Sequence, residues 1–275
     1  MPQKTGSTTR RDFARNALQS LTAFVLVEGL WSRRLLGEAV KPIVDVWFNE
    51  LYTISRDVHE RRSRDIEFQG ALERLYQRVD LKALIKTLDF DRLAQGVNFP
   101  SKGAKSLPVD FAHVGGLPVK LPFGGQIFAV GKGRSVVPHG HDNMATGFVV
   151  LKGDFRGRHY DRIEDNPDHY IIRPTIDRAF QTGEFSTISD HKDNVHWFTA
   201  ENETGFLFNI HVVETNPENP KRPGRVYVDP MGEKLAGGLI KAPKLSKGNK
   251  RIRNCSPASS PTDARPLPAN DPFHA

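Results

Sequence analysis

Apolar residues recur every three or four positions between Pro42 and about Gly96, which is the spacing of one face of an α-helix. These positions fall into three groups: Trp47, Leu51, Ile54 and Val58; Phe68, Leu72, Leu75 and Val79; and Leu84 and Leu88. Charged stretches such as RDVHERRSRD are typical of the solvated face of such helices. The pattern predicts a helical arm over residues 41–105 that packs against the following domain or forms a homodimer contact.

The pattern then changes to short apolar runs separated by Gly, Pro and Asp. The runs are GQIFAVG, ATGFVVLKG, DFRGRHYDR, HYIIRP, EFSTIS, VHWFTA and TGFLFNIHVVE. Several short strands at near-regular spacing are typical of an antiparallel sandwich or barrel. We predict a mainly β domain over residues 106–240, in which the chain leaves the core near Asn216. A disordered, basic and Ser/Pro-rich tail is expected over residues 241–275.

Composition and charge exclude several classes of function. Hydrophobic residues make up 38% of the chain, the mean hydropathy is -0.47, and no apolar run reaches the roughly 20 residues of a membrane-spanning helix. Much of the net charge of +7 lies near the two ends, and no basic patch is interleaved with aromatic residues, so we expect no nucleic-acid partner. The single cysteine, Cys255, excludes an intrachain disulfide and a cysteine-built metal site. Sequence motifs of serine hydrolases and phosphate loops are absent.

The first 40 residues resemble a twin-arginine export signal. Arg10 and Arg11 are followed by Phe13, Arg15 and an apolar segment from Leu18 to Leu30. Glu28 interrupts the apolar segment, and no A-x-A cleavage site follows it. The segment predicts export by the twin-arginine translocase, to the periplasm or beyond; the alternative is an amphipathic helix with two chance arginines.

The segment VVPHGHDNMATGFVVLKG carries two histidines, His139 and His141, two positions apart. Residues i and i+2 of a β-strand face the same side, so both imidazoles can reach one metal ion. His196, on a later strand-like run, is the predicted third ligand. Imidazole suits iron, zinc, copper and nickel. Five other histidines compete for the third position: His113, His159, His169, His191 and His211.

These residues resemble the first motif of the cupin superfamily, G-x5-H-x-H-x3-4-E-x6-G. Gly133, His139, His141 and Gly153 fall on that spacing, and Thr146 occupies the position of the glutamate. The resemblance implies a cupin-type double-stranded β-helix, or jelly-roll barrel, preceded by the α-helical arm.

Within that superfamily, the chain is most similar to the plant cysteine oxidase and 2-aminoethanethiol dioxygenase group, whose iron is held by three histidines without a glutamate. The similarity covers about residues 120–215 and rests also on Met144, Tyr160, Asp161 and Asn194. It implies that His139, His141 and His196 are the metal ligands and that Tyr160 is a catalytic residue. Asn209 stands where the group carries an aspartate near the substrate amine. We expect Thr146, Asn209 and His211 to line the substrate pocket.

The leading expectation is an exported, mononuclear non-haem iron oxygenase that converts a thiol to a sulfinate with O2. Zinc, nickel and manganese are alternatives to Fe(2+). The expected partners are a small-molecule substrate, O2 and, during export, the translocase. Two other functions stay open, namely a cupin module that binds a small molecule without oxygenase activity and a structural protein that acts through its helical arm.

Overall fold

The computed structural model describes residues 44–216 and 221–245. The helices are α2 (Val44–His59), α3 (Asp65–Gln77), α4 (Leu81–Thr87), α5 (Phe90–Ala94) and the short 3₁₀ helix η1 (Ala236–Gly238). The strands are β1 (Lys105–Pro108), β2 (Phe123–Val130), β3 (His139–Asp142), β4 (Met144–Lys152), β5 (Phe155–Asp165), β6 (His169–Phe180), β7 (Phe185–Ile188), β8 (Val195–Ala200), β9 (Gly205–Val213), β10 (Gly224–Tyr227), β11 (Glu233–Lys234) and β12 (Ile240–Pro243). The predicted export signal and most of the predicted tail lie outside the described residues and stay predictions.

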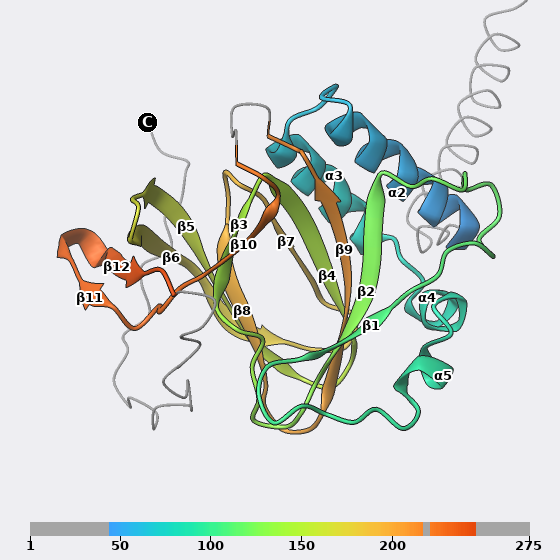
Figure 1. Ribbon diagram of the computed structural model, residues 1–275. Helices are drawn as coiled ribbons and strands as arrows, with labels where there is room; N and C mark the ends of the chain where they lie inside the picture. The colour runs from blue at the N-terminus through green and yellow to red at the C-terminus, as the bar shows by residue number, and fades with distance from the viewer. Residues whose placement is uncertain (1–43, 217–220, 246–275) are drawn as a thin grey trace, which may run out of the picture.

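Strands β2 to β9 form a jelly roll. One sheet has the order β1-β2-β9-β4-β7 and the other the order β10-β3-β8-β5-β6-β12-β11, with antiparallel pairing throughout. From β2 to β9, successive strands cross between the two sheets, except at the β5–β6 hairpin, so each sheet combines strands that are distant in sequence (Figure 1). This is the strand order of two interlocked Greek keys. The predicted jelly-roll barrel, preceded by helices, is confirmed.

The chain does not leave the barrel at Asn216 as predicted. Strand β10 pairs with β3, and β12 pairs with β6, so both extend the second sheet. Val228 and Ala242 in this region are 1% and 0% exposed, so they belong to the core. The apolar runs of these strands are short and are separated by Gly, Pro and Lys, so the sequence pattern did not identify them as strands. The β domain therefore extends past residue 240, to the end of β12 at Pro243.

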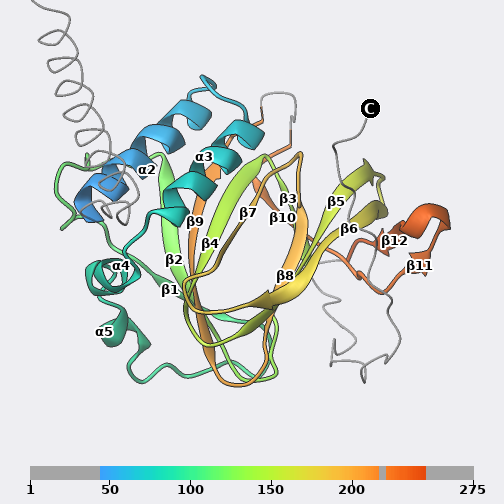
Figure 2. The ribbon, with the colours of Figure 1, turned by 180° about the vertical axis from the view of Figure 1, so that it is seen from behind.

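Helices α2 and α3 cover the outer face of the five-stranded sheet, where they contact strands β2, β4, β7 and β9. Figures 1 and 2 show these helices and the β11–β12 hairpin on opposite sides of the barrel. The Asp80 side chain caps α4 by accepting hydrogen bonds from the backbone N–H groups of Lys82 and Ala83. The predicted homodimer contact of this arm stays a prediction. Within the described part of the chain, no helix is both long and apolar enough to cross a membrane.

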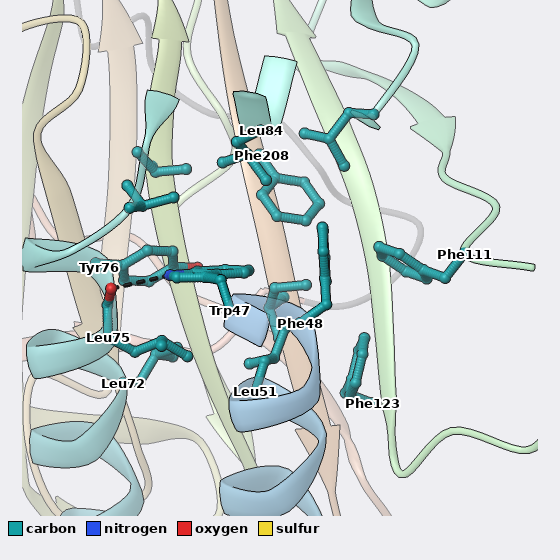
Figure 3. Packing of buried hydrophobic residues seen from close by; sticks show 14 of the residues in the cluster. Trp47, Phe48, Leu51, Leu72, Leu75, Tyr76, Leu84, Phe111, Phe123 and Phe208 are labelled. Atoms are coloured by element: carbon teal, nitrogen blue, oxygen red, sulfur yellow. Dashed lines mark hydrogen bonds between the residues drawn. The ribbon is translucent and has the colours of Figure 1, made fainter. Parts of the chain in front are cut away.

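The arm and the sheet share one hydrophobic core, part of which is shown in Figure 3. Trp47 of α2 is 1% exposed, and its indole N–H donates a 2.9 Å hydrogen bond to the carbonyl of Leu75 in α3. Phe48 of the same helix meets Phe111, which in turn meets Phe208 of β9. The apolar stripe predicted from the sequence is therefore the face by which the arm joins the barrel.

A second core lies between the two sheets. Phe148 and Val150 of β4 and Leu207 of β9 belong to it, whereas alternate residues such as Val149 and Phe208 face the helices. Because side chains alternate along a strand, the even positions of β4 and the odd positions of β9 line the barrel interior. Phe148 places its ring 5.5 Å from that of His196, so this apolar layer reaches the histidines.

Candidate metal centre

The three predicted ligands meet inside the barrel on two adjacent strands. His139 and His141 lie on β3, and His196 on β8 is the register partner of His139. The ring centroids are 4.9 Å apart for His139 and His141, 4.5 Å for His139 and His196, and 5.0 Å for His141 and His196. Each residue has a ligand atom within 4.8 Å of one from each of the other two, and all three are buried. The structure therefore brings together the three histidines that the sequence singled out.

The ring nitrogens of these histidines are arranged as metal donors. The Nδ1 atom of His139 lies 2.7 Å from the carbonyl oxygen of Val137, and that of His196 lies 3.1 Å from the carbonyl oxygen of Asn194. A carbonyl only accepts hydrogen bonds, so Nδ1 donates in both rings and Nε2 keeps a free lone pair. The Nε2 atom of His196 and both ring nitrogens of His141 are buried without a hydrogen-bond partner. Buried polar atoms without partners are costly, and a metal ion would satisfy them.

Strand β3 is fixed against β8 by a side chain. Asn194 donates a 2.9 Å hydrogen bond to the carbonyl of His141 and accepts one of 3.2 Å from its backbone N–H. A Cβ atom on Gly140 would lie 2.6 Å from the Asn194 Oδ1 atom, so the glycine makes this close approach possible. From the outer face, Arg162 donates to the His141 carbonyl and to the carboxylate of Asp142. These contacts hold the backbone that carries two of the ligands.

Burial keeps the three histidines neutral. Loss of solvation lowers the pKa of His139 and His141 well below the ordinary value, and it lowers the pKa of His196 to about 3. The positive charge of Arg225 acts in the same direction on the pKa of all three. A neutral imidazole is the form that binds a metal ion. At neutral pH these histidines can therefore bind a metal ion without first losing a proton.

The metal-free protein is expected to lose stability as the pH falls below about 6.5, the pKa of an unfolded histidine. His159, beside His196, has its pKa lowered mainly by burial, so the unfolded chain binds a proton that the folded chain does not. The stabilisation is therefore complete above the unfolded pKa and decreases by about 1.4 kcal/mol per pH unit for each such histidine. Urea unfolding of the native and His159→Phe chains between pH 7.5 and 5.5 measures this. The variant should show a shallower pH dependence, and equal slopes would contradict the expectation.

The competing histidines lie elsewhere or have other partners. His113 Nε2 contacts the carbonyl of Thr87, His169 contacts Asp168, and His191 contacts Asp65. His159 is completely buried near His196, with a ring-centroid distance of 6.1 Å, but both of its ring nitrogens lie 3.3 Å from the Ser186 hydroxyl. Among the described residues, only the predicted three form a group of at least three potential metal ligands.

Tyr160 does not reach the histidines, contrary to the expectation of a catalytic role. It follows His159 on β5, and because consecutive side chains point to opposite faces, Tyr160 faces away from the barrel interior. Its ring stacks on Trp197, with centroids 5.3 Å apart and an interplanar angle of 11°. Tyr160 also packs against the outer cluster that contains Tyr170 and Val195. This position suits packing rather than contact with a substrate in the barrel.

The predicted pocket residues do face the interior, on the sheet opposite the histidines. Asn209 donates to the Thr146 hydroxyl and accepts a 3.2 Å hydrogen bond from Gln126. The Thr146 hydroxyl donates a 2.6 Å hydrogen bond to the carbonyl of Ile210, so its donor is already used within the sheet. His211 pairs with Thr146 across the strands, and its Nδ1 atom is buried without a partner. It is outside the group of three ligands, so the structure does not add it as a fourth.

Two residues at the site were missed in the sequence because β10 was missed. Register pairs place Arg225 opposite His141 and Tyr227 opposite His139, so both side chains share the face of the ligands. The Tyr227 ring centroid is 6.0 Å from that of His139. The alternation Arg-Val-Tyr after a Pro-Gly turn was the only local signal, and it does not identify the partner strand.

Comparisons with known proteins give a fold likeness only. No protein-family model matches the chain, and no curated protein matches it. Solved structures with a similar fold include procruciferin, an 11S globulin from Brassica napus, at 9% identity and a TM-score of 0.34 over 50% of this chain and 30% of that one. Oxalate oxidase in complex with glycolate matches at 17% identity and a TM-score of 0.35, over 49% of this chain and 60% of that one.

A cupin superfamily protein from Desulfitobacterium hafniense DCB-2 matches at 12% identity and a TM-score of 0.29, over 44% of this chain and 87% of that one. The neighbours thus include a cupin protein, and the fold assignment rests on the strand order of the chain itself. The matches span less than two thirds of the procruciferin and oxalate oxidase chains.

Proposed function

We propose that the protein is a mononuclear non-haem iron oxygenase of cupin type that oxidises a small thiol to a sulfinate with O2. The observation that carries the proposal is the buried group formed by His139, His141 and His196, in which both ring nitrogens of His141 and the Nε2 atom of His196 have no hydrogen-bond partner in the protein. Neutral nitrogen donors fit a ferrous ion, and they also suit zinc and nickel. The thiol substrate is supported by the resemblance of the histidine motifs to the thiol dioxygenase group.

The residues of the chain hold and shield the site. His139 and His196 are oriented by backbone carbonyls, and Asn194 and Arg162 hold the strand that carries His141. Three neutral ligands leave the charge of a divalent ion uncompensated, so the site attracts an anionic sulfur. When bound, ferrous ion supplies open coordination positions for substrate and O2 and lowers the pKa of a coordinating thiol.

The apolar layer beside the histidines limits the access of water. Phe148 contacts His196, and Phe198 contacts both Phe148 and His159. A dry surrounding strengthens electrostatic contacts within the site and protects reactive species from side reactions. The overall reaction adds both atoms of O2 to the sulfur of R–SH and gives the sulfinic acid R–SO2H, so no external reductant is consumed.

Oxygen uptake tests the proposal. The full chain, loaded with ferrous ion under nitrogen, is mixed with small thiols and air-saturated buffer, and O2 consumption and sulfinate are measured. We expect equimolar uptake of O2 and thiol in the native chain and none above background in a His196→Ala chain. A His113→Ala chain, altered at a histidine outside the site, should behave like the native one. Uptake that survives in the His196→Ala chain would contradict the proposal, and tight ligand binding without any uptake would favour a binding module.

A further inference from the structure

We propose that Arg225 forms a subsite for an anionic group of the substrate, so that the preferred thiol carries a carboxylate and not an ammonium group. The inference rests on the proposed function and adds the class of substrate to it. Arg225 belongs to neither histidine motif. It lies on β10, outside residues 120–215, to which the resemblance to the thiol dioxygenase group is limited.

Arg225 crosses from one sheet of the barrel towards the other. Its backbone pairs with His141 of β3 in the second sheet, and its guanidinium carbon lies 5.4 Å from the ring centroid of Phe128 of β2 in the first. Phe128 belongs to the core between the sheets, where its ring contacts Phe148, and Phe148 contacts His196. The guanidinium therefore lies on the face of the sheet that carries the ligands, and two aromatic rings, those of Phe128 and Phe148, connect it to His196.

The guanidinium is available to a ligand. Arg225 is exposed, so its side chain is accessible to solvent while it shares the face of the sheet that carries His141. Within the described residues the Arg225 side chain takes part in no ion pair or hydrogen bond, and its guanidinium lies over the face of the Phe128 ring. An arginine over an aromatic ring keeps the edge of its guanidinium fork free for a planar anion.

The other interior groups around the ligands are uncharged. Gln126, Thr146 and Asn209 form one hydrogen-bonded row on the opposite sheet. Asp142, next to His141, is on the other face of β3 and pairs with Arg162. No carboxylate joins the three histidines among the described residues. A substrate ammonium would thus meet a cation and no anion, whereas a carboxylate would find a bidentate partner.

Calorimetric titration under nitrogen tests the subsite without turnover. The ferrous-loaded full chain is titrated with 3-mercaptopropionate, with 2-aminoethanethiol, and with succinate, which has a carboxylate and no thiol. We expect the native chain to bind 3-mercaptopropionate more tightly than 2-aminoethanethiol. An Arg225→Gln chain should bind both carboxylates about tenfold or more weakly, because a hydrogen bond to a charged group is lost. It should bind 2-aminoethanethiol no more weakly than the native chain does.

Arg222→Gln, a change at a second exposed arginine on the same segment, is the matched control and should leave all three affinities unchanged. Native preference for 2-aminoethanethiol would overturn the inference even if the variant failed to fold, and so would carboxylate affinities that do not change in a folded, metal-loaded Arg225→Gln chain. Arg225-dependent binding of succinate without oxygen uptake from any thiol would support the subsite and contradict the proposed reaction. Oxygen uptake with 2-aminoethanethiol as the preferred substrate would support the proposed reaction and contradict the subsite.

Discussion

A His141→Ala chain is expected to bind ferrous ion at least about 100-fold more weakly than the native chain. Losing a residue that only supports a metal ligand costs about 10–100-fold in affinity, and losing a ligand itself should cost no less. His141 is the most informative of the three ligands to replace, because neither of its ring nitrogens has a hydrogen-bond partner in the protein. The substitution therefore breaks no hydrogen bond of that ring. The change therefore reports metal binding with little loss of other contacts.

Competition against a coloured ferrous chelator under nitrogen measures this affinity. His113→Ala is the control, because His113 contacts a backbone carbonyl of the helical arm and lies outside the ligand group. It should keep the native affinity. Equal affinities of the His141→Ala and native chains would show that the ion is held elsewhere.

A Trp47→Ala substitution is expected to lower the free energy of unfolding by about 3–5 kcal/mol, a large part of the about 5–15 kcal/mol of a typical domain. The indole is 1% exposed and contacts the rings of Phe48 and Tyr76 at centroid distances of 5.0 and 5.8 Å. Its removal leaves a cavity at the centre of the core that the arm and the sheet share. The expected loss follows from the arm being part of the folded domain.

Urea unfolding followed by circular dichroism measures the effect. Trp47→Phe should be intermediate, because it keeps most of the apolar contact but leaves the Leu75 carbonyl without the indole donor. The control is Val46→Ala, a neighbouring residue that is 48% exposed, which should change stability by no more than about 0.5 kcal/mol. A loss below about 1 kcal/mol for Trp47→Ala would instead support an arm that docks loosely and is free to bind a partner.

Local patterns were sufficient for two of the three ligands and for the arm. His139 and His141 are two residues apart on a strand, a spacing that places both rings on one face in any sheet. The helical repeat of Trp47, Leu51 and Val58 likewise identifies the buried face of α2 without knowledge of its partner. Both features depend on periodicity within one element, which the sequence displays directly.

The remaining features depend on which strands pair and in which register. A shift of one residue moves a side chain to the other face of a sheet, so Tyr160 could not be placed from its distance to His141 along the chain. Arg225 reaches the site only because β10 returns to pair with β3, a contact between residues more than 80 positions apart. The short run Arg-Val-Tyr has no periodicity that could reveal this partner.

The metal content of the native chain tests the central claim most directly. The full-length protein, purified without chelator and without added metal, is digested and measured by elemental mass spectrometry beside a His139→Ala chain. We predict close to one transition-metal ion per native chain, with iron as the main element, and almost none in the variant. Zinc or nickel in the same proportion would keep the three-histidine site and contradict the oxygenase. No metal in the native chain, even after anaerobic addition of ferrous ion, would contradict the metal centre itself.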